Sequence, residues 1–326
     1  MRVTVAGAGA WGTALALELN EGGHHVSLWG HDPNRLREIH QSRSNDRYLP
    51  GVKVPETIRL EPYLQSATAE AEFIVIAVPS KAVRELAQKL KDFSGGIVSV
   101  AKGIEHDSGL TMCQILEREI PRARVATLSG PTFAPEVARK MPSAAVTASR
   151  NAEMALATQE LFHRPYFRVY TNRDLLGVEL GGALKNVIAV AAGICDGLGF
   201  GDNSKAALVT RAIAEIRRLG VACGAQPETF SGLSGLGDLT VTCFSRQSRN
   251  RAFGERIGKG EKAGEILPTL SSVVEGFPTA LSATQLARKL GVDAPIISEV
   301  HAMLYESKAP WEALRDLTSR DSKSED

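Results

Sequence analysis

The run Arg2–Ala6 (RVTVA), followed at once by Gly7–Gly12 (GAGAWG), decides how the first half of the chain folds. The β-branched run predicts a buried strand, and the helical pattern of Ala14–Glu21 comes after the glycines. Glycines at this spacing permit a tight turn, close approach of the backbone to a pyrophosphate, and close helix–strand packing. The helix start adds unpaired N–H groups and a positive dipole end. A structural turn is the alternative, but this order predicts a dinucleotide site whose glycines are Gly7, Gly9 and Gly12.

The first half of the chain alternates short strand-like runs with helical segments such as Ala82–Lys91. This alternation is typical of an α/β domain, a Rossmann-like, doubly wound and parallel sheet covered by helices. The expected strands are Arg2–Ala6, Val26–Trp29, Phe73–Val78, Ile97–Ala101, Val125–Ser129, Ala144–Ala148 and Phe167–Tyr170.

The pattern changes near residue 175, after which long helical segments replace the strands. Leu176–Leu198 and Ser204–Ala222 are the longest of these segments. We therefore predict a dinucleotide-binding domain over residues 1–175 and an all-α, substrate-binding domain over residues 176–318. The polar and charged residues 319–326 are expected to form a frayed tail.

Composition argues against several classes of protein. The net charge is only +1, whereas a nucleic-acid-binding protein needs a basic excess. The longest apolar run, Val187–Cys195, is about half the length of a membrane span, and the N-terminus lacks the apolar stretch of a signal peptide. The four cysteines form no CxxC pair, which indicates reduced thiols and no metal site. We expect a soluble, cytoplasmic protein.

The end of the second strand bears on which dinucleotide binds. An acid at this position is typical of NAD sites, but the residue here is Gly30, and Asp32 lies two residues later. His31 and Arg35 are placed to meet a 2′-phosphate, although a solvated turn explains Arg35 equally well. The pattern favours NADP(H) and leaves NAD(H) open. Val78–Ser80 ends another strand at the same sheet edge and would flank the cofactor.

Two polar segments of the first domain follow strands at this ligand-binding edge. Lys102 comes directly after a strand and is placed to hold an anion or a carbonyl oxygen, although it would also fit a surface lysine. Ser129–Glu136 leaves a strand through a turn, in which Thr132 is a candidate N-cap of the next helix. Such a turn can present N–H groups and a hydroxyl to a ligand, but a plain strand-to-helix connection would look the same.

Lys185 is the most informative residue of the second half. It lies within Glu179–Val187 (ELGGALKNV), a helical segment otherwise rich in small and apolar residues. Gly181 and Gly182 each cost a helix roughly 1 kcal/mol, so we expect another group to approach closely there. Burial would favour the neutral amine and suit Lys185 to proton transfer. A lysine that snorkels along a packed helix is the alternative.

Two later segments carry further polar groups. In Gln247–Arg251, Arg249 beside Ser248 and Asn250 would suit a phosphate, because a guanidinium offers a fork of charged donors. Asp238 follows two glycines and would accept a bond from a substrate hydroxyl or orient Lys185. A turn residue and a surface arginine are the alternatives.

Together these segments resemble one family, the bacterial-type NAD(P)-dependent glycerol-3-phosphate dehydrogenases. The resemblance runs from residue 1 to about residue 315, and its later motifs are more specific than the glycine motif. It rests on Gly7–Ala16, Ser129–Ala134, Gly181–Asn186, Gly235–Leu239 and Ser248–Asn250.

The resemblance implies reversible reduction of dihydroxyacetone phosphate to sn-glycerol 3-phosphate for phospholipid synthesis, with Lys185 as the proton donor and acceptor. It implies that the substrate is lined by Lys102, Gly130, Thr132, Lys185, Asp238, Ser248, Arg249 and Asn250. It places the dinucleotide against Ala10, Trp11, His31, Lys102, Ala134, Arg249, Val273 and Glu275. Many members carry Ser where this chain has Ala10, a departure that would remove one hydrogen bond near the pyrophosphate.

Two other functions remain as alternatives. A related β-hydroxyacid dehydrogenase or ketoacid reductase would share the domain plan and the lysine but would prefer a carboxylate. A dinucleotide-binding sensor without chemistry would not need Lys185. The long apolar helices are compatible with a homodimer, but the sequence does not establish one.

Overall fold

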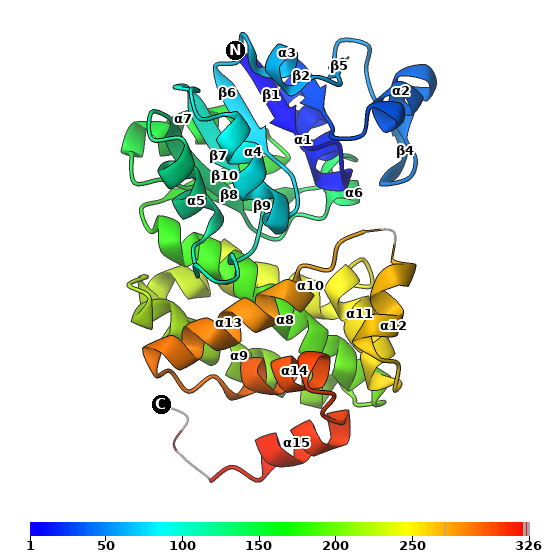
Figure 1. Cartoon of the computed structure of the whole chain (residues 1–326), viewed down its shortest axis with the longest axis vertical. Coiled ribbons are helices and arrows are strands. Elements are labelled where there is room, and N and C mark those ends of the chain that lie inside the picture. Colours follow the sequence, from blue (N-terminus) through cyan, green and yellow to red (C-terminus); the bar gives the residue numbers. More distant parts are fainter. Residues whose placement is uncertain (271, 322–323, 325–326) are drawn as a thin grey trace. The chain divides into compact units, whose positions relative to one another are not determined.

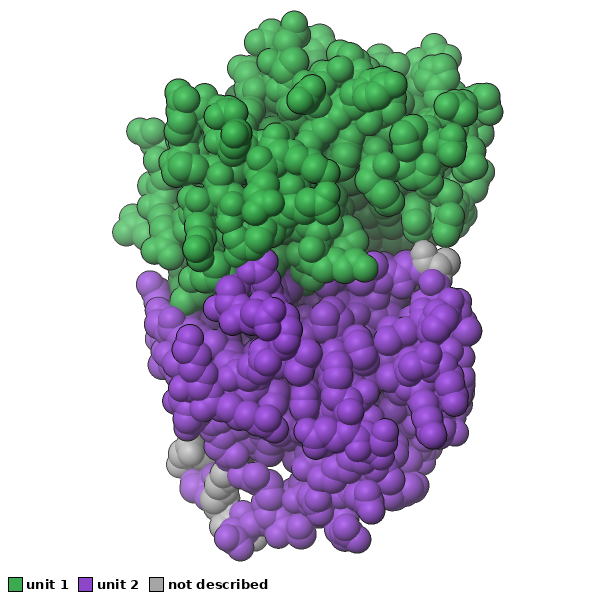
Figure 2. Space-filling view, in the orientation of Figure 1, with its two compact units in different colours: residues 1–102, 110–179 green, residues 103–109, 180–326 purple. Residues whose placement is uncertain are grey.

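The computed structural model describes residues 1–270, 272–321 and 324. The chain forms two compact units, coloured separately in Figure 2. The first contains Met1–Lys102 and Leu110–Glu179, and the second contains Gly103–Gly109 and Leu180–Asp326. The second unit thus begins a few residues after the predicted boundary and also takes the short segment that follows Lys102.

An eight-stranded sheet organises the first unit (Figure 1), in the order β10-β9-β8-β7-β6-β1-β2-β5. Numbered along the chain, the strands from β5 to β8 have the order 3-2-1-4-5-6, which is that of doubly wound dinucleotide-binding sheets. The predicted fold class is therefore confirmed. The strands are β1 (Arg2–Ala6), β2 (His25–Trp29), β5 (Arg59–Glu61), β6 (Phe73–Ile76), β7 (Gly96–Ser99), β8 (Arg124–Ser129), β9 (Ser143–Ala148) and β10 (Phe167–Asn172).

The sheet is mixed, which corrects the expectation of a wholly parallel one. β9 pairs antiparallel with β8, and β10 pairs parallel with β9. The connection from β8 to β9 contains only the four-residue helix α6 (Ala134–Val137). Such a helix is about 6 Å long, whereas a parallel crossover must return along a strand of about 20 Å. The chain therefore re-enters the sheet from the same end.

The central strands are apolar because helices cover both faces of the sheet. All four residues of β6 are buried, as expected for a parallel strand in the middle of an α/β domain. Helix α1 contacts both α6 and α7, and α4 contacts α5, which gives two layers. Besides α6, the helices of this unit are α1 (Ala10–Glu21), α2 (Pro33–Ser42), α3 (Leu64–Thr68), α4 (Val83–Lys89), α5 (Met112–Glu119) and α7 (Ala152–Phe162), with a 3₁₀ turn at Ser80–Ala82.

Three short elements of the first unit were not predicted. They are β5 and the hairpin of β3 (Ser44–Asn45) with β4 (Leu49–Lys53). In addition, α1 begins at Ala10 rather than Ala14. Its first turn contains Gly12, a residue that helix propensity disfavours.

Within its described residues, the second unit is built mainly from helices joined by loops. Its longest helix, α8 (Leu175–Gly197), begins in the first unit, and α9 (Asp202–Ala222) follows it. The other helices are α10 (Asp238–Phe244), α11 (Arg249–Gly258), α12 (Ala263–Ile266), α13 (Gly276–Leu290), α14 (Pro295–Tyr305) and α15 (Pro310–Thr318), with 3₁₀ turns at Pro227–Ser231 and Leu267–Thr269 and a π-helical turn at Leu233–Gly237.

Helix α8 is long and apolar enough to cross a membrane, but it is a core helix. Its most apolar window has a mean hydropathy of 1.5, and 94% of that window is buried inside the protein. This burial against other helices explains why nearly every position is apolar, since a surface helix would show a polar face.

Helices α8 and α11 touch backbone to backbone. A Cβ added at Gly193 would lie 1.9 Å from the Arg251 carbonyl oxygen, and one at Gly254 would lie 2.0 Å from that of Val190. A four-residue spacing puts the glycines of each helix on one face. This contact holds the start of α11 against α8. The glycines are Gly193 and Gly197 on α8, and Gly254 and Gly258 on α11.

The predicted frayed tail is described only in part. Arg320 forms an ion pair with Asp293, with 2.7 Å between Nη2 and Oδ2. Residues 322, 323, 325 and 326 lie outside the described residues.

The four cysteines are all free thiols, namely Cys113, Cys195, Cys223 and Cys243.

Candidate active site

Each glycine of the loop after β1 has a separate structural role. Gly7 has φ +133°, and a Cβ there would lie 2.4 Å from the Ala77 carbonyl oxygen. A Cβ on Gly12 would lie 1.8 Å from the Gly7 carbonyl oxygen, so helix and strand meet closely. A Cβ on Gly9 would meet nothing within 4 Å. Side chains are thus excluded where the loop packs, and open space lies beside Gly9.

The start of α1 offers donors beside this open space. Gly9 is the N-cap of α1 and has no side chain to satisfy the N–H groups of the first turn. Such a helix start binds anions through those groups and its dipole. The loop after β6, which carries Val78–Ser80, lies at the same carboxyl edge because β1 and β6 pair in parallel. The glycine loop therefore fits the pyrophosphate of a dinucleotide.

The acid near the end of β2, Asp32, already accepts hydrogen bonds from the protein backbone. Asp32 caps α2, where its Oδ1 accepts bonds from the backbone N–H of Asn34 at 3.0 Å and of Arg35 at 3.4 Å. The guanidinium of Arg35 lies 4.8 Å from the centre of the Tyr48 ring. His31 is exposed at the end of this segment. The end of β2 therefore presents a guanidinium and an imidazole, while the Asp32 carboxylate caps a helix.

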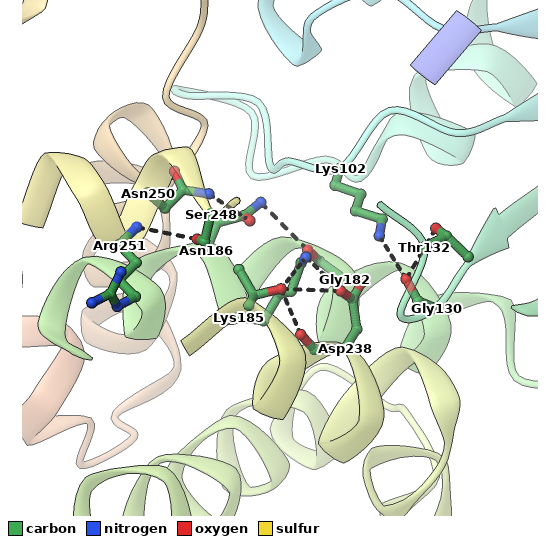
Figure 3. A network of polar contacts seen from close by, with 11 residues as sticks. Lys102, Gly130, Thr132, Gly182, Lys185, Asn186, Asp238, Ser248, Asn250 and Arg251 are labelled. Atoms are coloured by element: carbon green, nitrogen blue, oxygen red, sulfur yellow. Dashed lines mark hydrogen bonds and ion pairs between the residues drawn. The ribbon is translucent and has the colours of Figure 1, made fainter. Parts of the chain in front are cut away.

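Lys102, Gly130 and Thr132 come together on the first unit, as Figure 3 shows. Lys102 Nζ and Thr132 Oγ1 each donate to the Gly130 carbonyl oxygen at 3.3 Å. Gly130 has φ +142°, and a Cβ there would lie 3.0 Å from Ala145 Cα, so only glycine fits. The sequence expectation for Thr132 was wrong in one respect, because Phe133 is the N-cap of α6.

Lys185 lies on α8 within a buried polar cluster of the second unit (Figure 3). Its Nζ donates to Asp238 Oδ1 at 2.6 Å and to Thr242 Oγ1 at 2.8 Å. Lys185 is 7% exposed, and Asp238 is 2% exposed. A buried charge of this kind requires a paired and hydrogen-bonded partner, and Asp238 provides it. The alternative of a snorkelling lysine does not hold.

The local sequence explains how Asp238 and Thr242 reach Lys185. The π-helical turn Leu233–Gly237 passes so close to α8 that a Cβ on Gly181 would lie 2.9 Å from the Ser234 carbonyl oxygen. The suspected close approach at Gly181 is thus confirmed. Asp238 is the first residue of α10, and Thr242 follows four residues later on the same helix face.

A second chain of hydrogen bonds links α8, α11 and α13. Asn250 Nδ2 donates to Asn186 Oδ1 at 2.9 Å, and the Gly276 N–H donates to Asn250 Oδ1 at 2.9 Å. Ser248 caps α11 by accepting from the Arg251 N–H at 3.2 Å. Ser248 and Asn250 therefore have partners inside the protein. They place the start of α11 next to the residue after Lys185.

Arg249 is the side chain of this group that extends to solvent. Desolvation by the surrounding protein lowers the pKa of Arg249, and the charge of Glu275 raises it. Val273 and Glu275 lie in the half-buried segment just before α13. Arg249 is thus a cation at the start of α11, near Glu275, one of the residues assigned to the dinucleotide by resemblance.

Two family models match the chain. The model described as NAD-dependent glycerol-3-phosphate dehydrogenase N-terminus matches residues 2–155, and the corresponding C-terminus model matches residues 174–315. The chain belongs to the NAD-dependent glycerol-3-phosphate dehydrogenase family. A relative in Chlorobium phaeobacteroides strain BS1, named glycerol-3-phosphate dehydrogenase (NAD(P)+), is 48% identical over 331 residues, covering 100% of this chain and 99% of that protein.

Solved structures agree with this membership. The glycerol-3-phosphate dehydrogenase of Coxiella burnetii has a TM-score of 0.94 and 38% identity, covering 98% of this chain and 99% of that one. A ketopantoate reductase from Ralstonia eutropha has a TM-score of 0.63 at 16% identity, covering 96% of this chain and 100% of that one. The second likeness is one of fold alone.

Two polar residues of this candidate site, Asn186 and Thr242, were not predicted as site residues from the sequence. Thr242 lies four residues after Asp238, so its position on the same face of α10 was available as a signal. Asn186 directly follows Lys185, but its partner Asn250 is 64 residues away. In the described residues, no group of three or more His, Cys, Asp or Glu is placed to hold a metal ion.

Proposed function

We propose that this chain catalyses reversible hydride transfer between NAD(P)H and dihydroxyacetone phosphate to give sn-glycerol 3-phosphate, a precursor of phospholipids. The observation that carries the proposal is the buried Lys185–Asp238–Thr242 cluster in a chain with this family membership. The dinucleotide, bound at the glycine loop, supplies the hydride to C2 of the substrate.

Lys185 supplies the proton in this scheme. As an ammonium, it donates a proton to the C2 oxygen as the carbonyl becomes an alcohol, and solvent restores the proton afterwards. Asp238 accepts a hydrogen bond from the Lys185 amine at 2.6 Å, and Thr242 accepts a second one. The two bonds fix the orientation of the amine. In the reverse reaction the neutral amine accepts the same proton.

Arg249 and the start of α11 form the proposed phosphate site. Ser248 and Asn250 shape this helix start through their internal bonds, while the guanidinium and the first N–H groups of α11 face the anion. Lys102, Gly130 and Thr132, which the resemblance also assigns to the substrate, form a hydrogen-bonded cluster of their own on the first unit. Fixing the phosphate, which is remote from C2, aligns the reacting carbon.

NADP(H) is the proposed preferred dinucleotide. Asp32 is occupied as the cap of α2. The Arg35 guanidinium adds positive charge, and His31 adds an exposed imidazole, where a 2′-phosphate would lie. Gly30 has no carboxylate to accept a bond from the ribose hydroxyl of NAD.

The test follows the absorbance of NADPH, and separately of NADH, when dihydroxyacetone phosphate is added to the purified protein. Oxidation of both, with kcat/KM higher for NADPH, is the expected result. A branched 2-keto acid is the comparison substrate. Faster turnover of that acid would favour the ketoacid reductases, and no turnover by folded protein that binds the dinucleotide would favour a sensor.

A further inference from the structure

The β3–β4 hairpin, residues Ser44–Lys53, lies outside the main sheet but touches the dinucleotide loop. Its residue Asn45 is 1% exposed. Asn45 Nδ2 donates to the Ala8 carbonyl oxygen at 3.0 Å and to Thr13 Oγ1 at 2.8 Å. One amide thus spans the glycine loop and the first turns of α1, and both of its N–H groups are used.

The bond to Ala8 sets the direction of the next peptide N–H. In a planar trans peptide, the C=O and the following N–H point to opposite sides. Because the Ala8 carbonyl points to Asn45, the Gly9 N–H points away from the hairpin. Gly9 faces open space, since a Cβ there would meet nothing within 4 Å. This N–H is therefore directed by a side chain 36 residues later in the chain, counted from Gly9 to Asn45.

The hairpin is itself held firmly on the same helix. Leu49 is fully buried in a small apolar cluster with Ala14 of α1 and Ala134 of α6, and Trp11 and Val52 pack against that cluster. The hairpin therefore has a fixed position from which Asn45 can act. Apolar packing supplies that position, and the amide supplies the direction of the peptide.

We propose that Asn45 is a positioning residue for dinucleotide binding, which orients the Ala8–Gly9 peptide so that the Gly9 N–H donates to the pyrophosphate. The inference rests on the proposed function, because it needs a dinucleotide at this loop. Without the amide, the Ala8 carbonyl loses its buried partner and the peptide is free to rotate, which turns the donor away from the anion.

The test compares Asn45→Ala with Val52→Ala, a variant of the same hairpin that loses only apolar contact. Binding of NADPH and of adenosine 2′-monophosphate, which has no pyrophosphate, is measured by calorimetry, and thermal unfolding is recorded for each protein. Asn45→Ala is expected to weaken NADPH binding about tenfold, the size of one charge-assisted hydrogen bond. Its affinity for adenosine 2′-monophosphate should stay within about twofold of the wild type.

Steady-state kinetics give a second readout. Asn45→Ala should raise KM for NADPH by about the same factor, with kcat at saturation and KM for dihydroxyacetone phosphate little changed. Val52→Ala should lower the unfolding temperature without changing either affinity. If Asn45→Ala does not fold, Asn45→Ser, which keeps one donor on a shorter side chain, takes its place.

The outcomes separate the two proposals. If the wild type and Asn45→Ala bind NADPH equally well, the proposed role of Asn45 is overturned, but the proposed function is not. Equal weakening for NADPH and adenosine 2′-monophosphate would also overturn that role, because the effect would not be specific to the pyrophosphate. A folded wild type that binds neither NADPH nor NADH would overturn the proposed function, and this inference with it.

Discussion

At the scale of single residues, the Lys185–Asp238 pair is both charged and buried, and these two conditions usually conflict. Taking two charges out of water is costly, and the cost is offset only when the pair has good geometry and additional hydrogen bonds. Thr242 supplies one such bond, donating to the Asp238 carbonyl oxygen at 2.6 Å while accepting from Lys185. The cluster therefore keeps an ammonium in a buried position, where it can act on a substrate.

Removing only the lysine should reduce both activity and stability. Lys185→Met is expected to lower kcat by roughly 10²–10⁴-fold, the usual contribution of a proton-transferring residue. It should also lower the free energy of unfolding by about 3–5 kcal/mol, because the Asp238 carboxylate stays buried without its partner. Kinetics and urea unfolding measure the two effects.

The double variant Lys185→Met/Asp238→Asn distinguishes these effects. It should recover much of the lost stability, because no charge is left unpaired, while kcat stays as low as in the single variant. Recovery of turnover along with stability would contradict a proton-transferring role for Lys185.

Arg249 allows a separate test of the phosphate site. Arg249→Ala should raise KM for dihydroxyacetone phosphate roughly tenfold or more, because a charge-assisted contact to the phosphate is lost. Stability should change little, since the side chain is exposed. An unchanged KM would remove Arg249 from the phosphate site.

At the scale of elements, the site of the second unit depends on how closely α8 and α11 approach. The glycine contact brings the α11 backbone against α8, and the Asn250–Asn186 bond then forms across the junction. Four glycines weaken both helices in isolation, so this arrangement favours close packing over helix propensity. This close packing explains why Gly193 and Gly197 follow Lys185 along α8.

A methyl group at the contact should therefore be costly. Gly254→Ala places a Cβ 2.0 Å from the Val190 carbonyl oxygen, and the helices must separate. We expect a loss of about 1–3 kcal/mol in the free energy of unfolding and a higher KM for the substrate, because Asn250 moves with α11. Urea unfolding and steady-state kinetics provide the measurements.

Gly264→Ala is the matched control, because a Cβ on this glycine of α12 would meet nothing within 4 Å. It should leave stability unchanged or raise it by up to about 1 kcal/mol through helix propensity. If both variants lost the same stability, the contact between α8 and α11 would not be the cause.

At the scale of the whole molecule, three buried glutamates give stability a characteristic pH dependence. Burial raises the pKa of Glu18, Glu179 and Glu215 to about 7 in each case. Two of them still accept structural bonds. Glu179 accepts from Thr111 Oγ1 at 2.6 Å, and Glu215 caps α14 by accepting from the Ile297 N–H at 2.8 Å.

The sign of the effect follows from proton binding. The pKa of Glu215 is about 7 in the folded chain against an ordinary value of 4.5. Between these values the folded chain binds more protons than the unfolded chain, so stability falls as pH rises. The loss is on the order of 3 kcal/mol for one such carboxyl.

Glu215→Gln removes this titration while keeping a similar shape. Urea midpoints of the wild type should fall between pH 5 and pH 7 more steeply than those of Glu215→Gln. At pH 5, where Glu215 is protonated, the variant should be about 1 kcal/mol less stable than the wild type because its cap is weaker. Parallel pH profiles for the two proteins would contradict the raised pKa of Glu215.

The sequence by itself determined the features that depend on neighbours along the chain. The strand–glycine–helix start, the change to long helices near residue 175, and the small-residue surroundings of Lys185 are all local patterns, because burial and backbone freedom are encoded residue by residue. The motifs around Lys185, Asp238 and Arg249 were found for the same reason.

Only the tertiary structure decided which polar groups are partners. It assigned Asp32 to a helix cap, gave Ser248 and Asn250 internal bonds, turned β9 antiparallel and brought Asn45 to the Ala8 carbonyl. The caps formed by Asp32 and Ser248 are local, but the bonds of Asn45 and Asn250 join residues 37 and 64 positions apart. A hydrogen bond between two polar side chains depends on where packing places both of them, which no periodicity of either segment encodes.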